Sequence, residues 1–249
     1  MGISTSEAII LKSFNVNDQD KIVTFFTKDK GIIKGIAKGA RKFGNRFGSS
    51  LEPLSSVKVI YYEKETKELV TIQGCDLLES YFDIQKDLKV AFHFSYFSEL
   101  TEEFLPLKAK EDLSFRLLES VLRTIKERKD VSLVARYFEM WLLKIYGILP
   151  DFSQCLKCKK KWPQIAWLSP KKDGIYCDEC AQIKKHQLAS SMRLFLNWAL
   201  KNPPQKTENI SLSKEQLKSI AQNFQQIIIY HLERIPKTLQ YLEELRTEN

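Results

Sequence analysis

Four of the five cysteines form two closely spaced pairs, Cys155-x2-Cys158 and Cys177-x2-Cys180, with 18 residues between the pairs. The two-residue gap lets both thiolates of a pair reach one tetrahedral ion from a tight turn, and the spacer can fold back to add the second pair. Zn²⁺ favours this closed four-sulfur shell, which leaves no open position for a catalytic water. The spacing therefore predicts one structural zinc ion, with an iron–sulfur cluster or a redox dithiol as alternatives. Cys75 stands alone and is predicted to be a small core or strand-end residue.

Lysines are concentrated around the two cysteine pairs. They are Lys157, Lys159, Lys160, Lys161, Lys184 and Lys185. One interpretation is a surface that binds nucleic acid. A second is compensation of the net charge of about −2 that four thiolates leave on Zn²⁺. A third is a solvated face that keeps the protein soluble. The sequence leaves all three open.

A second concentration of positive charge lies in residues 28–46, where seven cations oppose one acid. The glycines of this segment let backbone N–H groups approach phosphates, and Phe43 and Phe47 could stack on bases. We assign contacts with nucleic-acid phosphates to five of the cations: Lys34, Lys38, Arg41, Lys42 and Arg46. The alternative is a β-hairpin with a solvated lysine face, whose phenylalanines are tucked into a barrel.

Residues that could do acid–base chemistry are present but scattered. His93, His186 and His231 are each predicted to be packing or surface residues, and Asp18 and Asp20 to form a turn. The sequence has no Gly-Lys-Ser/Thr of a phosphate-binding loop, no Gly-x-Ser-x-Gly, no His-Glu-x-x-His and no dinucleotide fingerprint. These observations favour a binding protein over an enzyme.

The elements that must position these groups change character along the chain. Short runs rich in apolar, β-branched and aromatic residues, separated by turn-forming residues, predict strands. They lie at residues 7–14, 21–27, 32–37, 57–62 and 69–72. Five short strands within about 75 residues are typical of a small closed barrel, for which the OB-fold is the obvious candidate.

After Leu77 the apolar spacing becomes helical. Helices are predicted at residues 84–105, 113–125, 131–145, 187–201, 213–231 and 239–245. Gly147 and Pro150 end the third, and Ser213 and Gln216 have capping-box spacing for the fifth. The prediction is an α+β fold. It has a nucleic-acid-binding OB-fold barrel in residues 1–80 and an all-helical domain in residues 81–249, which carries the zinc module at residues 151–186.

The composition indicates which class of partner and which cellular compartment to expect. The 249 residues are 43% hydrophobic, which is enough for a buried core, and their formal net charge of +8 favours an anionic partner such as nucleic acid. No apolar run approaches the ~20 residues that a membrane helix needs. No signal peptide is visible, so we expect a cytoplasmic protein without a membrane partner. In a reducing compartment, paired cysteines point to metal rather than disulfides.

Taken in order, these features resemble the RecO family, bacterial mediators of recombinational DNA repair. The N-terminal resemblance rests on Gly31, Lys38-Gly39-Ala40-Arg41 and Leu51-Glu52-Pro53-Leu54. The later resemblance rests on Phe115-Arg116-Leu117-Leu118, Phe138-Glu139 with Leu142-Leu143, Gly147-Ile148-Leu149-Pro150 and Gly174-Ile175-Tyr176-Cys177. Two departures are Lys159, where a glycine is common in the family, and the single glycine before Cys177, where two are frequent.

The resemblance implies binding of single- and double-stranded DNA and annealing of complementary strands. It also implies partnership with RecR and with the single-strand-binding protein SSB, and through them help in loading RecA, at the nucleoid of a bacterium. Some members of the family lack the cysteines, which agrees with a structural metal. The alternatives are a zinc-containing enzyme that modifies or cleaves nucleic acid, and a scaffold whose basic surface captures an acidic peptide.

Overall fold

The computed structural model of the chain describes residues 2–64 and 67–247, and it divides into two compact units. The first unit comprises Met1–Leu122 and Lys237–Asn249, and the second comprises Arg123–Pro236. The first unit therefore includes, besides the predicted barrel, helical segments that follow the barrel and the C-terminal helix. We predicted a domain boundary after residue 80. Whether residues 1–80 and 81–249 fold independently stays a prediction.

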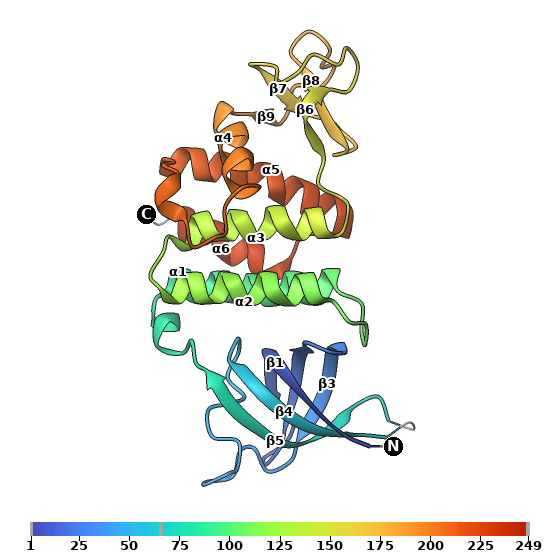
Figure 1. Cartoon of the computed structure of the whole chain (residues 1–249), viewed down its shortest axis with the longest axis vertical. Helices are drawn as coiled ribbons and strands as arrows, with labels where there is room; N and C mark the ends of the chain where they lie inside the picture. Colours follow the sequence, from blue (N-terminus) through green and yellow to red (C-terminus); the bar gives the residue numbers. More distant parts are fainter. Residues whose placement is uncertain (1, 65–66, 248–249) are drawn as a thin grey trace. The chain divides into compact units, whose positions relative to one another are not determined.

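The N-terminal segment forms a closed five-stranded barrel in the order β1-β2-β3-β5-β4 (Figure 1). Its strands are β1 (Gly2–Asn15), β2 (Lys21–Thr27), β3 (Gly31–Ala37), β4 (Ser56–Glu63) and β5 (Val70–Glu79). β3 and β5 run parallel, the other neighbours run antiparallel, and β4 closes the barrel on β1. This is the OB topology, so the predicted fold is confirmed. β1 is longer than expected because its first half pairs with β4 and its second half with β2.

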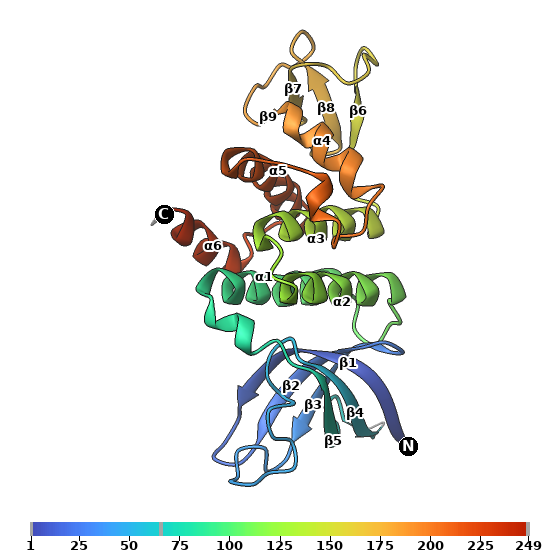
Figure 2. The same cartoon turned by 60° about the vertical axis from the view of Figure 1, so that its left-hand side comes forward.

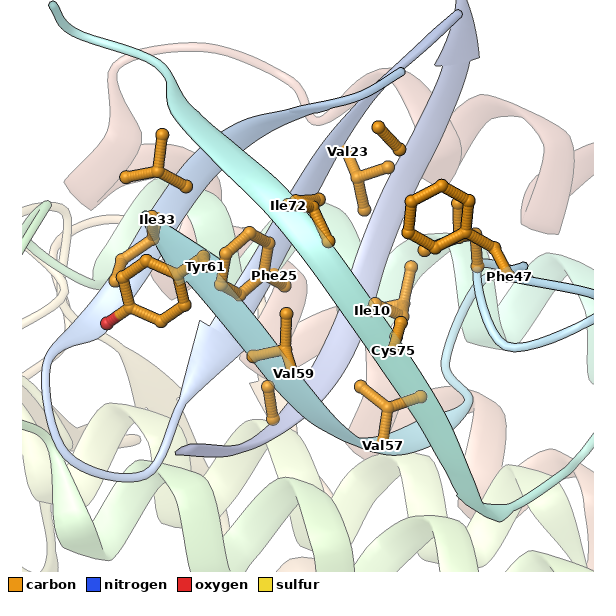
Figure 3. Packing of buried hydrophobic residues seen from close by; sticks show 14 of the residues in the cluster. Ile10, Val23, Phe25, Ile33, Phe47, Val57, Val59, Tyr61, Ile72 and Cys75 are labelled. Carbon is orange, nitrogen blue, oxygen red and sulfur yellow. The ribbon is translucent and has the colours of Figure 1, made fainter. Parts of the chain in front are cut away.

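The barrel is filled by side chains that alternate along its strands, as the period of two requires. A cluster of fifteen described residues, all buried, forms this core. Within it the rings of Phe25 and Tyr61 meet edge to face at 5.7 Å (Figure 3). Cys75 belongs to the same cluster, as predicted, and burial raises the pKa of its thiol to about 11.

Gly31 begins β3 at a point of close backbone approach. Its φ is +69°, and a Cβ at this position would lie 1.9 Å from the carbonyl oxygen of Ala109. The segment before α2 runs alongside β3 here, with the Lys108 N–H donating to the Ile32 carbonyl at 3.1 Å. Only glycine tolerates both the conformation and the contact.

Helices α1 (Leu88–Phe104) and α2 (Asp112–Lys126) cover part of the outer barrel surface, after a short 3₁₀ turn at Asp83–Lys86 (Figure 1). The Ser98 hydroxyl donates to the Leu11 carbonyl at 2.7 Å, and Phe26 packs edge to face on Phe115 at 5.3 Å. These contacts explain why outward-facing apolar residues of β1 and β2 are buried.

The C-terminal helix α6 (Lys237–Thr247) packs on α1 (Figure 2). The buried Glu99 carboxylate accepts hydrogen bonds from the backbone N–H groups of Lys237 and Thr238, at 2.9 and 2.8 Å. The rings of Phe92 and Tyr241 stack at 5.9 Å. A carboxylate at a helix N-terminus satisfies donors that have no partner within the helix.

The second unit combines helices with a small sheet (Figure 1). The helices are α3 (Val131–Ile145), α4 (Ser190–Ala199) and α5 (Lys214–Leu232), with a 3₁₀ turn at Thr207–Asn209. The strands are β6 (Asp151–Cys155), β7 (Ala166–Leu168), β8 (Gly174–Cys177) and β9 (Gln187–Leu188), in the order β6-β8-β7-β9. The capping box at Ser213 and Gln216 is present, as predicted.

The expectation of an all-helical C-terminal part needs correction at the cysteine module, residues 151–186, and at β9. Strands of two to five residues form a sheet there, and residues 187–188, expected to begin a helix, belong to β9. Such short strands span too few residues to show a period of two in the sequence. Among the helices that the structure describes, none combines the length and apolar character needed to cross a membrane.

Candidate metal centre and nucleic-acid interface

The four paired cysteines converge in the second unit. The sulfur atoms of Cys155, Cys158, Cys177 and Cys180 all lie within 4.8 Å of one another, and those of Cys158 and Cys177 are 3.7 Å apart. A zinc–sulfur bond of about 2.3 Å gives a tetrahedron with edges of about 3.8 Å, which fits this separation. These four sulfurs could hold one metal ion in a closed shell.

The local backbone prepares the sulfurs to carry negative charge. Burial raises the pKa of Cys155, but N–H groups of Cys177, Cys158 and Lys157 that point to its sulfur outweigh burial and lower the pKa to about 6. The pKa of Cys180 rises to about 12, because its thiol donates to Cys177 and the other sulfurs, and burial adds to the effect. A divalent cation removes this conflict, since it stabilises all four thiolates together.

Each cysteine pair spans a tight turn. Lys159 donates its N–H to the Cys155 carbonyl at 3.0 Å, and Cys180 donates to the Cys177 carbonyl at 3.0 Å. The first turn ends with Lys159 at φ +61°, a left-handed conformation that favours glycine. Lys159 adopts this conformation under strain.

Gly174 places the second pair beside the first. β8 begins at Gly174 and ends at Cys177, and a Cβ on Gly174 would lie 2.7 Å from the Leu156 side chain. The Leu156 N–H donates to the Ile175 carbonyl at 2.8 Å. The glycine before the second cysteine pair is therefore needed for close packing of the two cysteine turns.

The five cations assigned to DNA contacts lie on β3 and on the following loop, residues 38–55. Lys34, Lys38, Arg41, Lys42 and Arg46 all have exposed side chains. Lys34, Lys38 and Lys42 form no ion pair with any carboxylate in the described part of the chain. By contrast, Lys28 pairs with Glu7 at 2.8 Å, and Lys30 pairs with Glu63 at 3.5 Å. The excess positive charge therefore remains on β3 and its loop.

The loop is anchored by a turn whose role in the site was not predicted. The Asp20 carboxylate accepts the Gly39 N–H at 2.8 Å and the Asn17 side-chain amide at 3.1 Å. These hydrogen bonds lower the pKa of Asp20, and the nearby Lys38 and Lys42 lower it further. Asn17 also accepts the N–H groups of Gln19 and Asp20, so the turn expected around Asp18 and Asp20 is present. Its contact with the loop joins segments 19 residues apart, which local patterns do not reveal.

The two arginines have structural contacts as well as charge. Arg41 donates from its guanidinium to the Asn17 carbonyl, and its N–H donates to the Gln19 carbonyl at 3.0 Å. Arg46 donates to the Ile72 carbonyl at 3.4 Å and lies over the Phe47 ring at 4.7 Å. Their removal would therefore disturb the loop, which makes the three lysines the cleaner test of phosphate contacts.

The structure separates the two phenylalanines of the loop. Phe43 is fully exposed, whereas Phe47 is 3% exposed and belongs to the barrel core. Figure 3 shows Phe47 reaching from the loop toward the core residues. The interpretation that Phe47 stacks on bases is therefore wrong, because its ring is buried in the barrel core. Phe43 is free to stack.

An apolar row on the outer face of the barrel lies near this loop. Phe14 is opposite Ile22, Ile22 is opposite Ile36, and Ile36 is opposite Thr71, across four neighbouring strands. Residues directly opposite each other point to the same face of a sheet. Phe14 is 56% exposed, and the other three are partly exposed. The row was missed in the sequence because its members come from four separate strands.

The histidines do not form a catalytic group in the described residues. His93 is buried, with Nδ1 at 2.6 Å from the Lys89 carbonyl, and His231 is exposed. His186 is partly exposed, and burial together with the charges of Lys172 and Lys185 lowers its pKa.

The barrel, the helices and the four-sulfur centre define a class of protein, an OB-barrel protein with an attached cysteine module. Family models assign it more closely. The model described as Recombination protein O N terminal matches residues 1–81, and the model described as Recombination protein O C terminal matches residues 85–240. The chain therefore belongs to the RecO family of DNA repair proteins, as the resemblance predicted.

Curated relatives match over most or nearly all of the chain. DNA repair protein RecO of Koribacter versatilis is 30% identical over 243 residues, which cover 98% of this chain and 99% of the relative. The protein of the same name from Dehalococcoides mccartyi is 28% identical over 97% of this chain and 95% of its own length. That from Caldicellulosiruptor saccharolyticus is 32% identical over 71% of this chain and 72% of its own.

Proposed function

We propose that this protein is a recombination mediator that binds single- and double-stranded DNA and anneals complementary strands without bond-making chemistry. In this role it works with RecR on strands coated by SSB and thereby assists the loading of RecA, in the cytoplasm at the bacterial nucleoid. Membership of the RecO family supports the proposal. The observation that carries it is the set of unpaired cations on β3 and its loop, next to the apolar row.

The mechanism follows from charge and stacking. Lys34, Lys38, Arg41, Lys42 and Arg46 neutralise phosphates along the strand, which lowers the repulsion between two strands that must pair. Phe43 and the apolar row provide flat and apolar surfaces for unstacked bases, as on other barrels of this type. The metal centre holds one structural zinc ion that shapes the module.

Salt dependence tests the phosphate contacts. If all five cations contact phosphates of a single strand, the logarithm of the affinity should fall against the logarithm of the salt concentration with a slope of roughly −3.5. The variant Lys34→Gln, Lys38→Gln, Lys42→Gln should reduce that slope by about 2. A variant with the same change of charge elsewhere on the barrel, Lys28→Gln, Lys30→Gln, Lys58→Gln, is the matched control. Equal slopes for the two variants would refute the assignment.

Annealing tests the mediator role. Two complementary strands, one carrying a donor dye and one an acceptor, should pair faster with the protein than without it, both bare and coated with SSB. Adding Mg²⁺ should leave the strands chemically unchanged on a denaturing gel. A cleaved or modified strand would favour the zinc-containing enzyme instead.

The variant Phe43→Ala tests whether Phe43 stacks on bases. Stacking on an aromatic ring contributes about 1–3 kcal/mol per base, so affinity for single strands should fall by about fivefold to 150-fold. Phe43 is fully exposed, so the free energy of unfolding should change by less than about 0.5 kcal/mol. Unchanged affinity would remove Phe43 from the interface and leave the cations.

A further inference from the structure

The cysteine module contains a cavity of about 240 Å³ between its sheet and the start of α4. Apolar side chains from the sheet line it, Phe152, Ala166, Ile175 and Leu188, together with Trp162 and Arg193. The Arg193 guanidinium lies over the Trp162 ring at 4.8 Å. Pockets for drug-sized ligands measure about 300–1,000 Å³, so this cavity suits one flat ring rather than a large molecule.

The surface of the module is strongly basic. Residues 151–186 contain eight lysines and four acidic residues. Only two of these lysines have carboxylate partners within the described residues: Lys160 pairs with Glu179 at 3.8 Å, and Lys184 pairs with Asp178 at 2.7 Å. The remaining lysines are Lys157, Lys159, Lys161, Lys171, Lys172 and Lys185, and Arg193 adds another cation at the cavity.

Two of these cations lie away from the end of β8 that carries Cys177. Lys171 and Lys172 occupy the turn before β8, and Cys177 lies at the other end of that four-residue strand. A strand of this length separates its ends by about 10 Å. Burial and the neighbouring Lys185 lower the pKa of Lys172, so these cations repel one another at close range. Like charges held together without acidic partners indicate a site for an anion.

The cavity and the cation cluster lie along the same two strands. Ala166 is opposite Leu188 at the cavity wall, and two residues further the Leu168 N–H donates to the His186 carbonyl at 2.9 Å. The step along the strands is about 7 Å. A ligand that fills the cavity and reaches the cluster must carry anionic groups along its length, as a polynucleotide does at every residue.

We propose that the cysteine module is a second binding site for single-stranded nucleic acid, in which the cavity takes a base against Trp162 and the cations Lys171, Lys172, Lys185 and Arg193 take backbone phosphates. The inference rests on the proposed function and adds a second strand-binding surface to the barrel. It assigns to nucleic acid those lysines of the module that lie away from the sulfurs.

Two variants of the full-length, zinc-loaded protein test the site with oligothymidylate. The triple variant Lys171→Gln, Lys172→Gln, Lys185→Gln should reduce the log–log salt slope by about 2. The matched control Lys201→Gln, Lys206→Gln, Lys218→Gln removes the same charge from exposed positions on the helical part of the unit and should leave the slope unchanged. Zinc content, measured by a chelating dye, checks that the module stays folded in both.

Tryptophan fluorescence tests the cavity independently of charge. Oligothymidylate should quench the wild-type emission, and Trp162→Phe should remove most of that quenching while the other tryptophans remain. Equal quenching in Trp162→Phe, or an unchanged slope in the lysine variant, would overturn the inference. The inference would also be overturned if an acidic peptide with an aromatic end quenched the emission and oligothymidylate did not.

The outcome also separates the two proposals. If the barrel variant Lys34→Gln, Lys38→Gln, Lys42→Gln loses salt slope and the module variant does not, the second site is wrong and the proposed function stands. If the wild type ignores DNA at low ionic strength, both are wrong.

Discussion

The barrel and the cysteine module are both small sheets, but they are stabilised in different ways. The barrel closes on itself around a cluster of fifteen buried residues among those described. The module contributes three strands of three to five residues to a sheet that β9 completes, and its buried residues include Cys155 and Cys177. The first sheet is stabilised by the apolar area that it removes from water, whereas the second is short and brings together four cysteines that could hold a metal ion.

Backbone strain follows the same division. Among the described residues, seven that are not glycine have positive φ, and three of them, Lys159, Trp162 and Lys172, lie in the module. None lies in a strand of the barrel. Such conformations cost about 1–3 kcal/mol each. A metal ion bound to the four cysteines could offset that cost.

The largest expected effect is loss of the metal. Cys155→Ser with Cys177→Ser should abolish zinc binding and unfold residues 151–186, since structural zinc contributes about 10–16 kcal/mol of apparent binding free energy in small domains. Amide hydrogen exchange should show lost protection in the module and retained protection in β1–β5. The comparison fails if the module stays protected, or if the purified protein contains stoichiometric iron.

Phe47→Ala should have the next largest effect, and on the barrel alone. Removing a buried phenylalanine costs about 3–5 kcal/mol, because the cavity cannot fully close. Chemical denaturation should show a lower midpoint for the first unit, with zinc content unchanged. A loss below about 1 kcal/mol would mean that the loop, and not the core, determines where Phe47 packs.

Gly31→Ala tests the close contact between β3 and the segment before α2. The added Cβ meets the Ala109 carbonyl oxygen at 1.9 Å, so strain and displacement together should cost at least about 2 kcal/mol. Gly44→Ala is the matched control, since its φ is +66° but no atom lies within 4 Å of the added Cβ. Denaturation of both should separate the clash from the conformational cost, and equal losses would contradict the close approach.

Lys159→Gly should have the smallest effect and the opposite sign. Relief of the left-handed strain, reduced by the greater chain entropy of glycine, should stabilise the module by about 1 kcal/mol. Competition with a zinc chelator should show tighter retention of the metal. Lys157→Gly, in the same turn, is the control and should not improve retention. Weaker retention in Lys159→Gly would show that the lysine charge matters more than the backbone.

Much of the fold could be predicted from local patterns. The barrel strands, the helices α1 to α3 and the capping box of α5 follow from apolar periods and capping residues. The four cysteines were found from their spacing alone, because the short gap already places two sulfurs in one turn. The sheet of the module was missed, because strands of two to five residues are too short to show a period of two in the sequence.

What the sequence determined by itself is therefore local: the ligand set, the strand and helix periods and the excess of cations in residues 28–46. The tertiary structure alone decided which of those cations stay free of carboxylates, which phenylalanine is buried, and that Phe14, Ile22 and Ile36 form one row. The physical reason is that burial, pairing and strand register depend on contacts between residues far apart in the chain, and no local pattern records them.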